Sequence, residues 1–324
     1  MTISLNHPLI KKSQSLIALF LLCLLFSLLS DKFMTSANLW NVLRQISVNV
    51  CISVGMTLVV LMAGIDLSVG SVLGFTAAVC AGLLKNGLSF ESMDLFVGFS
   101  VLGAILVSIL IGLALGLFNG WVITKFSIPP FVATLAMLTI ARGLTMLYTE
   151  GIPISNLGTE FEFIGSGWIL GIPAPVWISI FMVLIVLFLT KKTTFGRYIY
   201  AIGGNERAAF LSGININKIK LTVYGIAGMM AAVGGVLVTS RLNSAQPNAG
   251  TSYELDSIAA VVIGGTSLSG GIGTVAGTVI GAIIIGVLNN GLVLLDVSPF
   301  WQQVVKGFVI LLAVIIDKMN QKNK

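Results

Sequence analysis

Apolar residues follow one another in long runs along this chain, and they do not alternate with polar residues. Ten runs predict ten spans, at residues 14–30, 46–63, 68–84, 94–119, 130–149, 174–190, 219–240, 255–266, 271–291 and 299–316. Most of them approach the roughly 20 residues that a helix needs to cross a hydrocarbon core, and the eighth is the shortest. Continuous apolar runs favour helices over barrel strands, in which polar and apolar residues alternate. The pattern predicts an all-α fold, a polytopic transmembrane bundle, with residues 1–324 as a single domain.

Composition supports a chain that lies mostly in lipid. Hydrophobic residues make up 56% of it and charged residues 9%, and the mean hydropathy is +1.02. A soluble domain has about 25% charged residues, so this chain has too little polar surface for one. No small-x-small cleavage site follows the first run, which we therefore expect to be an uncleaved span.

Basic residues predict the orientation, because they favour cytoplasmic loops. With the N-terminus inside, the cytoplasmic set is Lys11, Lys12, Lys125, Lys191, Lys192, Arg197, Arg207, Lys218, Lys220, Lys318, Lys322 and Lys324. The outer set is only Lys32, Arg44, Lys85 and Arg241. We expect both termini in the cytoplasm and the loop 191–220 on the same side. The net charge of +6 is then a topology signal and does not indicate a nucleic-acid partner.

Catalytic and metal-binding chemistry is scarce. The single histidine is His7, and Cys23, Cys51 and Cys80 fall one each in the first three runs, so neither a zinc cluster nor a Cys–His pair is expected. The glycine-rich stretch 264–277 lacks the G-K-[ST] ending of a phosphate loop. We predict no catalytic residue, no metal, no bound cofactor and no ATPase site in this chain.

Glycines recur every fourth residue in two sets. These are Gly112, Gly116 and Gly120, and Gly273, Gly277 and Gly281. Each set predicts a smooth ridge on one helix face, where a neighbouring backbone approaches closely. Helix packing is the favoured interpretation, and a sliding surface is the alternative.

Two stretches interrupt the apolar pattern, AGIDLSVGS (63–71) and GGTSLSGG (264–271). Asp66 and Ser68 are placed to bond free N–H groups at the start of the third predicted helix. A tight turn with a cap is one interpretation. The other is a lining of a solute path, since irregular backbone at membrane depth must be satisfied by protein or water.

Away from the ends of the predicted spans, intramembrane charge is limited to Arg142 and Lys306, which we expect to face the bundle, a partner or the headgroups. No span carries a carboxylate deep in its core. This disfavours a proton- or sodium-driven carrier, which commonly needs such an acid near the midplane. Energy for any transport would then enter elsewhere.

The stretch GGNERAAFLSGININKIK (203–220) is unusually polar for this chain. It predicts a short amphipathic helix with an Asn205 cap, an apolar patch of Ala208, Ala209, Phe210 and Leu211, and a stop at Gly213. Such a helix could place Phe210 and Leu211 in a groove on another protein. The alternative is a surface helix packed on its own bundle.

Four stretches together resemble the membrane subunits of bacterial ribose-type ABC importers. They are VGMTLVVLMAGIDLSVGS, FGRYIYAIGGNERAAFLSGININKIK, SAQPNAGTSYELDSIAAVVIGGTSLSGG and GVLNNGLVLL, and the similarity runs along almost the whole chain. The resemblance implies a ten-helix permease of the inner membrane that works as a homodimer. It also implies a cytoplasmic ATPase that uses ATP and Mg, and a periplasmic binding protein that delivers ribose.

The resemblance assigns the ATPase-coupling helix to Asn205, Glu206, Arg207, Ala208, Ala209, Phe210, Leu211, Ser212 and Gly213. Arg207 stands where the related loop of another importer class has glutamate. Related permeases for xylose, galactose and a furanosyl signalling molecule share much of the skeleton, so the sugar remains open. An ion-coupled secondary carrier for a small polar solute is the alternative function.

Two further sets of polar residues are candidate sites. Neutral polar residues in the spans could line a sugar path: Asn49, Thr57, Thr134, Thr139, Asn289 and Asn290. Acidic residues of the predicted outer loops, 150–173 and 244–256, could dock the binding protein: Glu160, Glu162 and Glu254.

Overall fold

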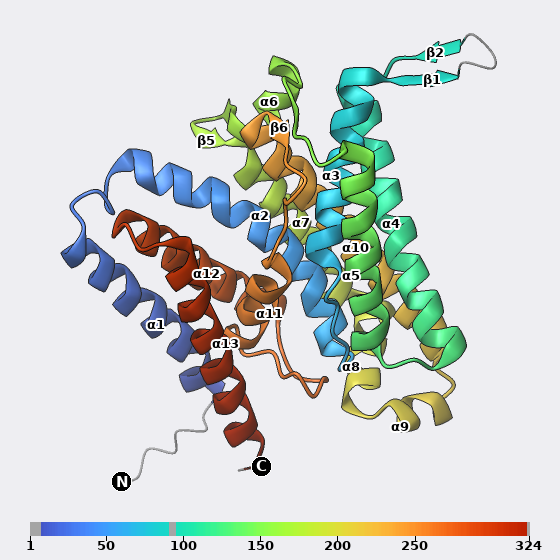
Figure 1. Cartoon of the computed structure of the whole chain (residues 1–324). Helices are drawn as coiled ribbons and strands as arrows, with labels where there is room; N and C mark the ends of the chain where they lie inside the picture. The colour runs from blue at the N-terminus through green and yellow to red at the C-terminus, as the bar shows by residue number, and fades with distance from the viewer. Residues whose placement is uncertain (1–7, 91–94, 323–324) are drawn as a thin grey trace. The chain divides into compact units, whose positions relative to one another are not determined.

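A computed structural model describes residues 8–90 and 95–322, and it is almost wholly helical (Figure 1). The helices are α1 (Pro8–Leu29), α2 (Ser36–Leu61), α3 (Val69–Asn86), α4 (Val101–Phe126), α5 (Pro130–Thr149), α6 (Thr159–Ser166), α7 (Ala174–Lys192), α8 (Thr194–Gly204), α9 (Glu206–Leu211), α10 (Ile216–Leu242), α11 (Tyr253–Ile263), α12 (Val275–Leu294) and α13 (Pro299–Lys322). Strands form three antiparallel pairs: β1 (Leu88–Phe90) with β2 (Leu95–Val97), β3 (Ile154–Ser155) with β6 (Ser244–Ala245), and β4 (Trp168–Ile169) with β5 (Ile172–Pro173). The all-α prediction is confirmed. His7 and Lys324 lie outside the described residues.

Every predicted run falls on a helix, but the helices are not equally able to span a membrane. In the described part of the chain, 7 helices are long and apolar enough: α2, α3, α4, α5, α7, α10 and α12. Helices α1 and α13 carry shorter apolar segments, and α11 has only 11 residues. At 1.5 Å per residue, α11 extends for about 17 Å, roughly half of a hydrocarbon core.

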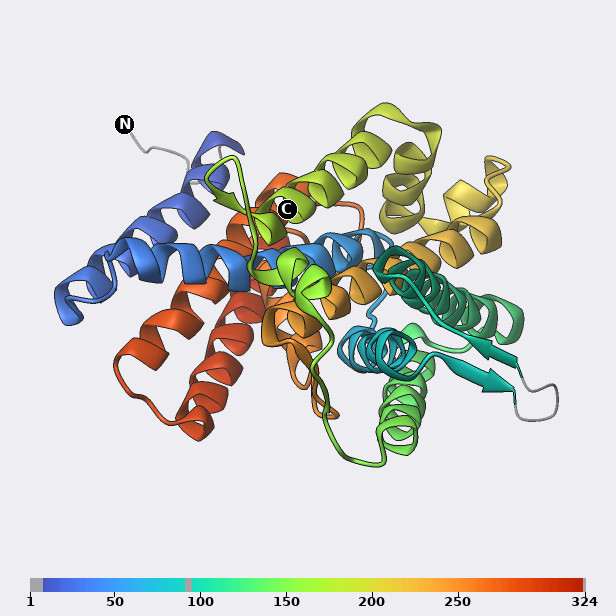
Figure 2. The ribbon, with the colours of Figure 1, turned by 90° about the horizontal axis from the view of Figure 1, so that it is seen from above.

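Several helix boundaries differ from the predicted runs, and the starts of α4 and α2 show why. Helix α4 begins at Val101 and not at 94, because the β1–β2 ribbon precedes it and the Ser100 hydroxyl accepts a hydrogen bond from the Gly103 N–H (Figure 2). Helix α2 begins at Ser36, well before residue 46, and the Thr35 side chain caps it. Hydropathy detects only the apolar part of a helix, whereas caps and turns decide where the helix ends.

The chain divides by its internal contacts into two compact units. The first contains residues 1–64, 183–214 and 255–324, and the second contains residues 65–182 and 215–254. The predicted loop 191–220 is therefore shared, because α8 and α9 belong to the first unit and α10 belongs to the second.

In the second unit, α4 packs along α10 through the first predicted glycine ridge. A Cβ at Gly112 would meet Gly228, one at Gly116 would meet the Tyr224 carbonyl, and one at Gly120 would meet Leu221. The helix-packing interpretation is confirmed for this set. At the other end of α4, Ala104 joins a buried core that α3, α6 and α10 complete, with Phe161 of α6 fully buried.

The second unit also contains two non-helical segments close to the start of α3. Residues 65–68 lead into α3, and residues 246–252 run beside its first two turns, where Gly70 contacts Gly250 and Gly74 contacts Ala249. A side chain at Gly70 would collide with the Gly250 carbonyl. The eighth predicted span, 255–266, falls on the short helix α11, which these irregular residues precede.

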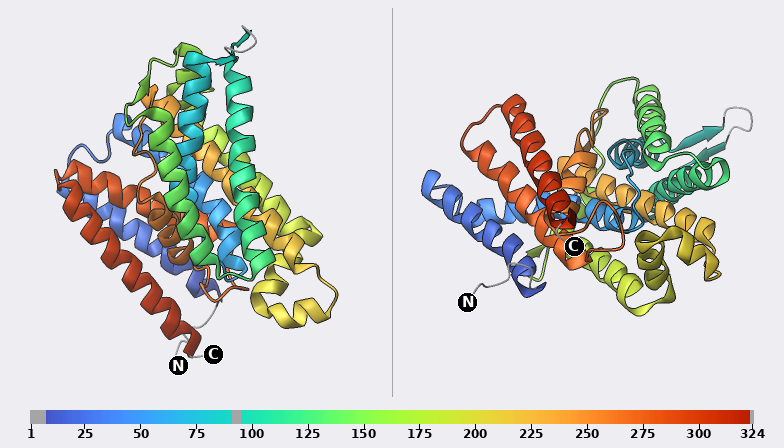
Figure 3. Two further views of the ribbon diagram at one scale, coloured as in Figure 1. Left: turned by 45° about the vertical axis from the view of Figure 1, so that its right-hand side comes forward. Right: turned by 90° about the horizontal axis from the view of Figure 1, so that it is seen from below.

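In the first unit, α12 packs against both α1 and α2 (Figure 3). Gly286 of α12 contacts Ile46 of α2, and Gly291 contacts the ring of Phe26 of α1. The second predicted glycine ridge is only partly correct. Gly277 and Gly281 lie on α12 and face Gly264 and Ala260, but Gly273 precedes the helix, with φ +152, so it is not on its face.

Candidate functional site

The predicted short helix is α9, which has six residues and follows α8. Asn205 is extended (φ −160, ψ 101), and its side-chain oxygen accepts a hydrogen bond from the Ala208 N–H at 2.9 Å. At the other end, Gly213 adopts φ +82, and the N–H of Ile214 bonds to the Ala209 carbonyl. Both predicted end signals are confirmed, because an amide caps the start and a left-handed glycine ends the helix.

Helix α9 buries one residue and exposes its two largest apolar side chains. Ala209 is 4% exposed, whereas Phe210 is 66% exposed and Leu211 is 75% exposed. Glu206, Arg207 and Ser212 are also at the surface. The small buried alanine lets the helix lie close to its own unit, and the two apolar side chains remain available for another surface.

Helix α8, which precedes α9, is packed firmly within the first unit. Ile199 and Ile202 of α8 are buried, and Gly203 contacts both the Leu61 carbonyl at the end of α2 and the Gly271 N–H. Gly271 in turn donates to the Leu61 carbonyl at 2.9 Å. Helix α8, which directly precedes α9, is therefore packed against the end of α2 and the turn before α12.

Tyr200 adds a hydrogen bond between α8 and the turn before α12. Its hydroxyl donates to the Gly273 carbonyl at 2.9 Å, and burial raises the pKa of the Tyr200 phenol, so the donor proton is retained. The GGTSLSGG stretch is a turn in which Ser267 accepts from the Ser269 N–H, and Thr274 caps α12. Tight turns and caps are thus present at this interruption.

The AGIDLSVGS interruption is also a capped turn, though not as predicted. The Asp66 carboxylate accepts from the Ser68 N–H at 2.9 Å and from the Ser68 hydroxyl at 2.6 Å. Ser68 makes no side-chain cap to α3, so its predicted capping role is wrong. The reason is a competing partner, because its hydroxyl accepts from Asn119 of α4 at 3.0 Å.

The predicted path residues separate into two groups. Asn49, Thr57, Asn289 and Asn290 lie in the first unit, on α2 and α12. Thr57 bonds to Thr278 at 2.7 Å, and Asn290 exchanges two bonds with Asn38 at 2.9 Å each. These contacts hold α2 against α12.

The remaining two path residues lie in the second unit on α5. Thr134 is buried and bonds to the Ile65 carbonyl at 3.2 Å and to the Pro130 carbonyl of its own turn. Thr139 is exposed and bonds to the Leu135 carbonyl one turn back. Threonines in helices often satisfy themselves in this way.

Arg142 is accounted for by the irregular segment of the second unit. Its guanidinium donates to the Pro247 carbonyl at 2.8 Å and to the Ala249 carbonyl at 2.9 Å. These carbonyls have no helical partner, since residues 246–252 are not helical. Arg142 therefore supplies hydrogen bonds to backbone carbonyls that no helix satisfies.

Lys306 is paired with a carboxylate that the apolar pattern concealed. Its Nζ lies 3.0 Å from the Asp256 Oδ2, which also accepts from Asn289 at 3.3 Å. Asp256 lies in the first turn of α11 and is buried. Helix α11 is not among the described helices that are long enough to span a membrane, so the expectation that no span carries a deep carboxylate stays a prediction. Asp256 stands at the edge of the run 255–266, and hydropathy alone could not show whether α11 buries it.

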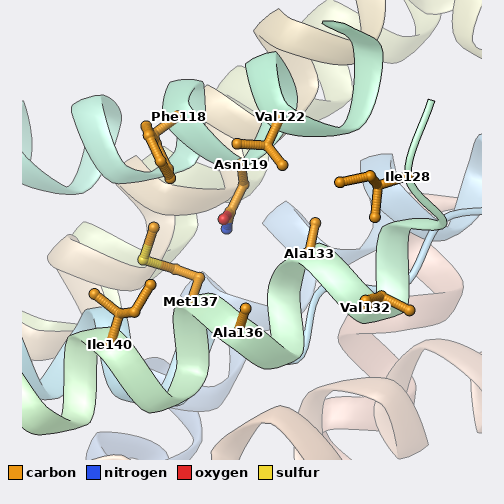
Figure 4. A pocket seen from close by; sticks show the side chains of 9 residues that line it. All are labelled: Phe118, Asn119, Val122, Ile128, Val132, Ala133, Ala136, Met137 and Ile140. Atoms are coloured by element: carbon orange, nitrogen blue, oxygen red, sulfur yellow. The ribbon is translucent and has the colours of Figure 1, made fainter. Parts of the chain in front are cut away.

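A pocket of about 280 Å³ lies between α4 and α5 of the second unit (Figure 4). Eight of its nine lining side chains are apolar, and the polar one, Asn119, comes from α4. A sugar needs several polar partners, so this pocket suits an acyl chain better than a monosaccharide.

The three predicted docking glutamates do not share one surface. Glu160 and Glu162 lie on α6, and Glu162 accepts a bond from Asn243 at 3.1 Å. Glu254 instead contacts Gly70 in the first turn of α3, whereas α6 packs near Leu83 at the opposite end of that helix. Thirteen helical residues span about 20 Å. The physical reason is that residues 246–252 run along α3 and do not stay in an outer loop.

Among the described residues, no group of three His, Cys, Asp or Glu side chains could hold a metal ion. Cys51 and Cys80 are buried free thiols in α2 and α3. Asn119 was not among the predicted site residues, and its only sequence signal was an amide in an otherwise apolar run.

Comparison with known proteins identifies a family of transport permeases. The model of the permease component of branched-chain amino acid transport systems matches residues 38–314. The ribose import permease of Haemophilus influenzae is 49% identical over 310 residues, covering 94% of this chain and 93% of that protein. The ribose import permease of Bacillus subtilis is 49% identical over 304 residues, covering 93% and 91%.

A xylose transport permease of Haemophilus influenzae is 35% identical over 369 residues, covering 95% of this chain and 96% of that protein. No solved structure matches the chain.

Proposed function

Because this chain belongs to the family of branched-chain amino acid transport system permease components, we propose that it is the membrane subunit of an ATP-driven importer of ribose or a closely related monosaccharide. Identity to ribose permeases, at 49%, exceeds identity to a xylose permease, at 35%, which supports ribose as the solute. The chain is a multi-pass protein of the bacterial inner membrane and a transport subunit.

The proposed topology has ten spans in one permease domain, residues 1–324, with both termini in the cytoplasm. It adds α1, α11 with its preceding irregular segment, and α13 to the helices that are long enough by themselves. The excess of basic residues on one set of loops supports this orientation.

The proposed partners are a second copy of the chain, a cytoplasmic ATPase that binds ATP and Mg, a periplasmic sugar-binding protein, and membrane lipid. The chain itself binds no cofactor and no nucleic acid. Glu160 and Glu162 dock the binding protein in this proposal. Rim charges of this kind mainly accelerate association and make it sensitive to salt.

Coupling to the ATPase is assigned to residues 205–213, and the exposure of Phe210 and Leu211 on a capped helix is the observation that carries this proposal. Large apolar side chains at the centre of an interface commonly contribute 2 kcal/mol or more. Glu206 and Arg207 form the rim. The contacts of Gly203 and Tyr200 provide a route from α9 to α2 and α12.

The deciding experiment measures ATP hydrolysis in liposomes that contain the permease and the ATPase, with and without ribose-loaded binding protein. The double variant Phe210→Ala, Leu211→Ala should lower the stimulated rate about tenfold or more. The matched control is Leu106→Ala, Leu110→Ala, which removes two exposed apolar side chains from α4, outside both residues 205–213 and the 150–173 loop. Normal ATPase binding and normal stimulation in the α9 variant would refute the coupling assignment.

The same liposomes test the docking residues. Glu160→Lys, Glu162→Lys should reduce stimulation at low salt and less at high salt, because screening weakens rim electrostatics. Unchanged stimulation across the salt series would exclude these glutamates from the docking surface.

The alternative, an ion-coupled secondary carrier, is favoured by one observation, the buried Asp256 carboxylate in α11. In the proposed importer, Lys306 neutralises that carboxylate. Uptake that stops when an ion gradient is collapsed, and that needs no ATPase, would establish the carrier instead.

A further inference from the structure

Three side chains meet in the first unit, one from each of α11, α12 and α13. Asp256 Oδ2 accepts from Lys306 Nζ at 3.0 Å and from Asn289 Nδ2 at 3.3 Å. The Asp256 side chain is 4% exposed and the Lys306 side chain is 21% exposed. The cluster is therefore buried at Asp256 and open to its surroundings at Lys306.

Two oxygens of this cluster have no hydrogen-bond partner in the part of the chain that the structure describes. Asp256 Oδ1 and Asn289 Oδ1 are both buried and accept no bond. The amide orientation is set by the carboxylate, because a carboxylate only accepts and so requires the NH₂ side of Asn289 to face it. A buried acceptor that has left water without gaining a donor is costly, and native proteins rarely leave one unmet.

The charges of the cluster select the kind of ligand. Two unmet acceptors require donors, which excludes an anion. Lys306 already neutralises Asp256, and its ammonium would repel a metal cation or an amine placed on the same carboxylate. The remaining ligands are neutral donors, and among imported solutes the ones with more than one O–H group are polyols such as a monosaccharide.

The position of the cluster in the fold also fits a transport role. Asp256 lies in the first turn of α11, an 11-residue helix that follows the irregular residues 246–252. Interrupted helices in transporters commonly hold the solute site, because irregular backbone survives at membrane depth only where protein or water satisfies it.

We propose that Asp256 Oδ1 and Asn289 Oδ1 form a binding site for hydroxyl groups of the imported monosaccharide. This inference rests on the proposed function and names the residues that would recognise its substrate. Two hydrogen bonds of this kind hold a sugar weakly, which suits a site that must release its ligand. Lys306 positions and neutralises Asp256, and it does not contact the sugar.

The test is Asn289→Leu, with Asn290→Leu as its matched control. Both residues are buried neighbours on α12, but Asn290 already uses both amide atoms on Asn38. Asn289→Leu removes an unmet acceptor and leaves the Asp256–Lys306 pair in place. It should therefore insert and remain as heat-stable as the parent protein, whereas Asn290→Leu strands Asn38 and should lower the melting temperature.

Transport should show the opposite order. In liposomes with the ATPase and saturating loaded binding protein, Asn289→Leu should lower ATP-driven ribose uptake about tenfold, and Asn290→Leu should lower it less. Asn289→Leu should also discriminate less between ribose and singly deoxygenated riboses, because the variant lacks the acceptor that would bond to the hydroxyl of ribose. A purely structural role would change the uptake of all sugars equally. If Asn289→Leu does not insert, Asn289→Ala replaces it.

The outcomes separate this inference from the function that it rests on. Wild-type liposomes that show no ATP-dependent uptake of ribose or another pentose would overturn both. Wild-type uptake of a pentose, combined with unchanged uptake and unchanged deoxy-sugar preference in the Asn289 variant, would overturn only the site. That second result would mean that water fills the two acceptors.

Discussion

At the scale of single residues, buried charges in this protein serve identifiable partners. Lys306 neutralises Asp256, and Arg142 bonds to two carbonyls of a segment that has no helical hydrogen bonds. A charged side chain in a membrane helix is expensive unless it finds such a partner. Arg142 thus stabilises the irregular residues 246–252, and it need not contact the solute to be important.

Replacing Arg142 by methionine should remove this support. Arg142→Met keeps a long apolar side chain but leaves the Pro247 and Ala249 carbonyls without a donor, which we expect to cost about 2 to 4 kcal/mol. Thermal unfolding in detergent measures the loss. The control is Thr139→Val on the same helix, where an exposed hydroxyl bonds only to its own turn and the change should stay within about 0.5 kcal/mol. Equal melting temperatures for the two variants would contradict the role of Arg142.

At the scale of helices, glycine positions decide which pairs approach closely. Gly112, Gly116 and Gly120 bring α4 against the backbone of α10, whereas a Cβ at Gly143 of α5 would meet no atom within 4 Å among the described residues beyond its own helix backbone. The same residue type therefore has a packing role in one helix and none in another.

This contrast yields a paired prediction. Gly116→Ala should be destabilising by about 1 to 3 kcal/mol, because its methyl group would collide with the Tyr224 carbonyl and force α4 away from α10. Gly143→Ala should be neutral or stabilising by up to about 1 kcal/mol, since alanine favours the helix. Melting temperatures in the same detergent compare the two. The packing argument fails if both variants melt together.

At the scale of the whole molecule, the proposed topology places the two faces of the protein in different compartments. Leu170, in the turn between β4 and β5, is 89% exposed, and Ser212 is exposed just after α9. The one helix between them that is long enough to span the membrane is α7. One span separates these positions, so they should face opposite sides.

Single cysteines test this arrangement in a variant that lacks Cys23, Cys51 and Cys80. In intact cells, a membrane-impermeant maleimide should label Leu170→Cys on the outer face. Ser212→Cys should react only after the membrane is permeabilised. Labelling of both positions from the same side would show that α7 does not cross the membrane.

The sequence by itself was sufficient for features that depend on neighbours along the chain. Apolar runs predicted the helices, because backbone groups in lipid must be satisfied within a segment. Asn205 and Gly213 predicted the ends of α9, and the four-residue glycine spacing predicted the face of α4, because caps and helix faces are local. The resemblance to ribose-type importer permeases lies in continuous stretches of sequence, and it therefore predicted the family.

Only the tertiary structure decided which distant groups meet. Asp256 and Lys306 are 50 residues apart, and Arg142 reaches carbonyls more than 100 residues away. No local pattern encodes these pairs. The same limit explains the errors. Ser68 bonds to Asn119 and does not cap the helix, Gly273 lies in a turn against Thr266, and Glu254 follows a non-helical segment that runs along α3. The type of a residue shows which interactions its side chain can make. The packing of the helices determines which partner it meets, because burial and hydrogen-bond geometry depend on elements far apart in the chain.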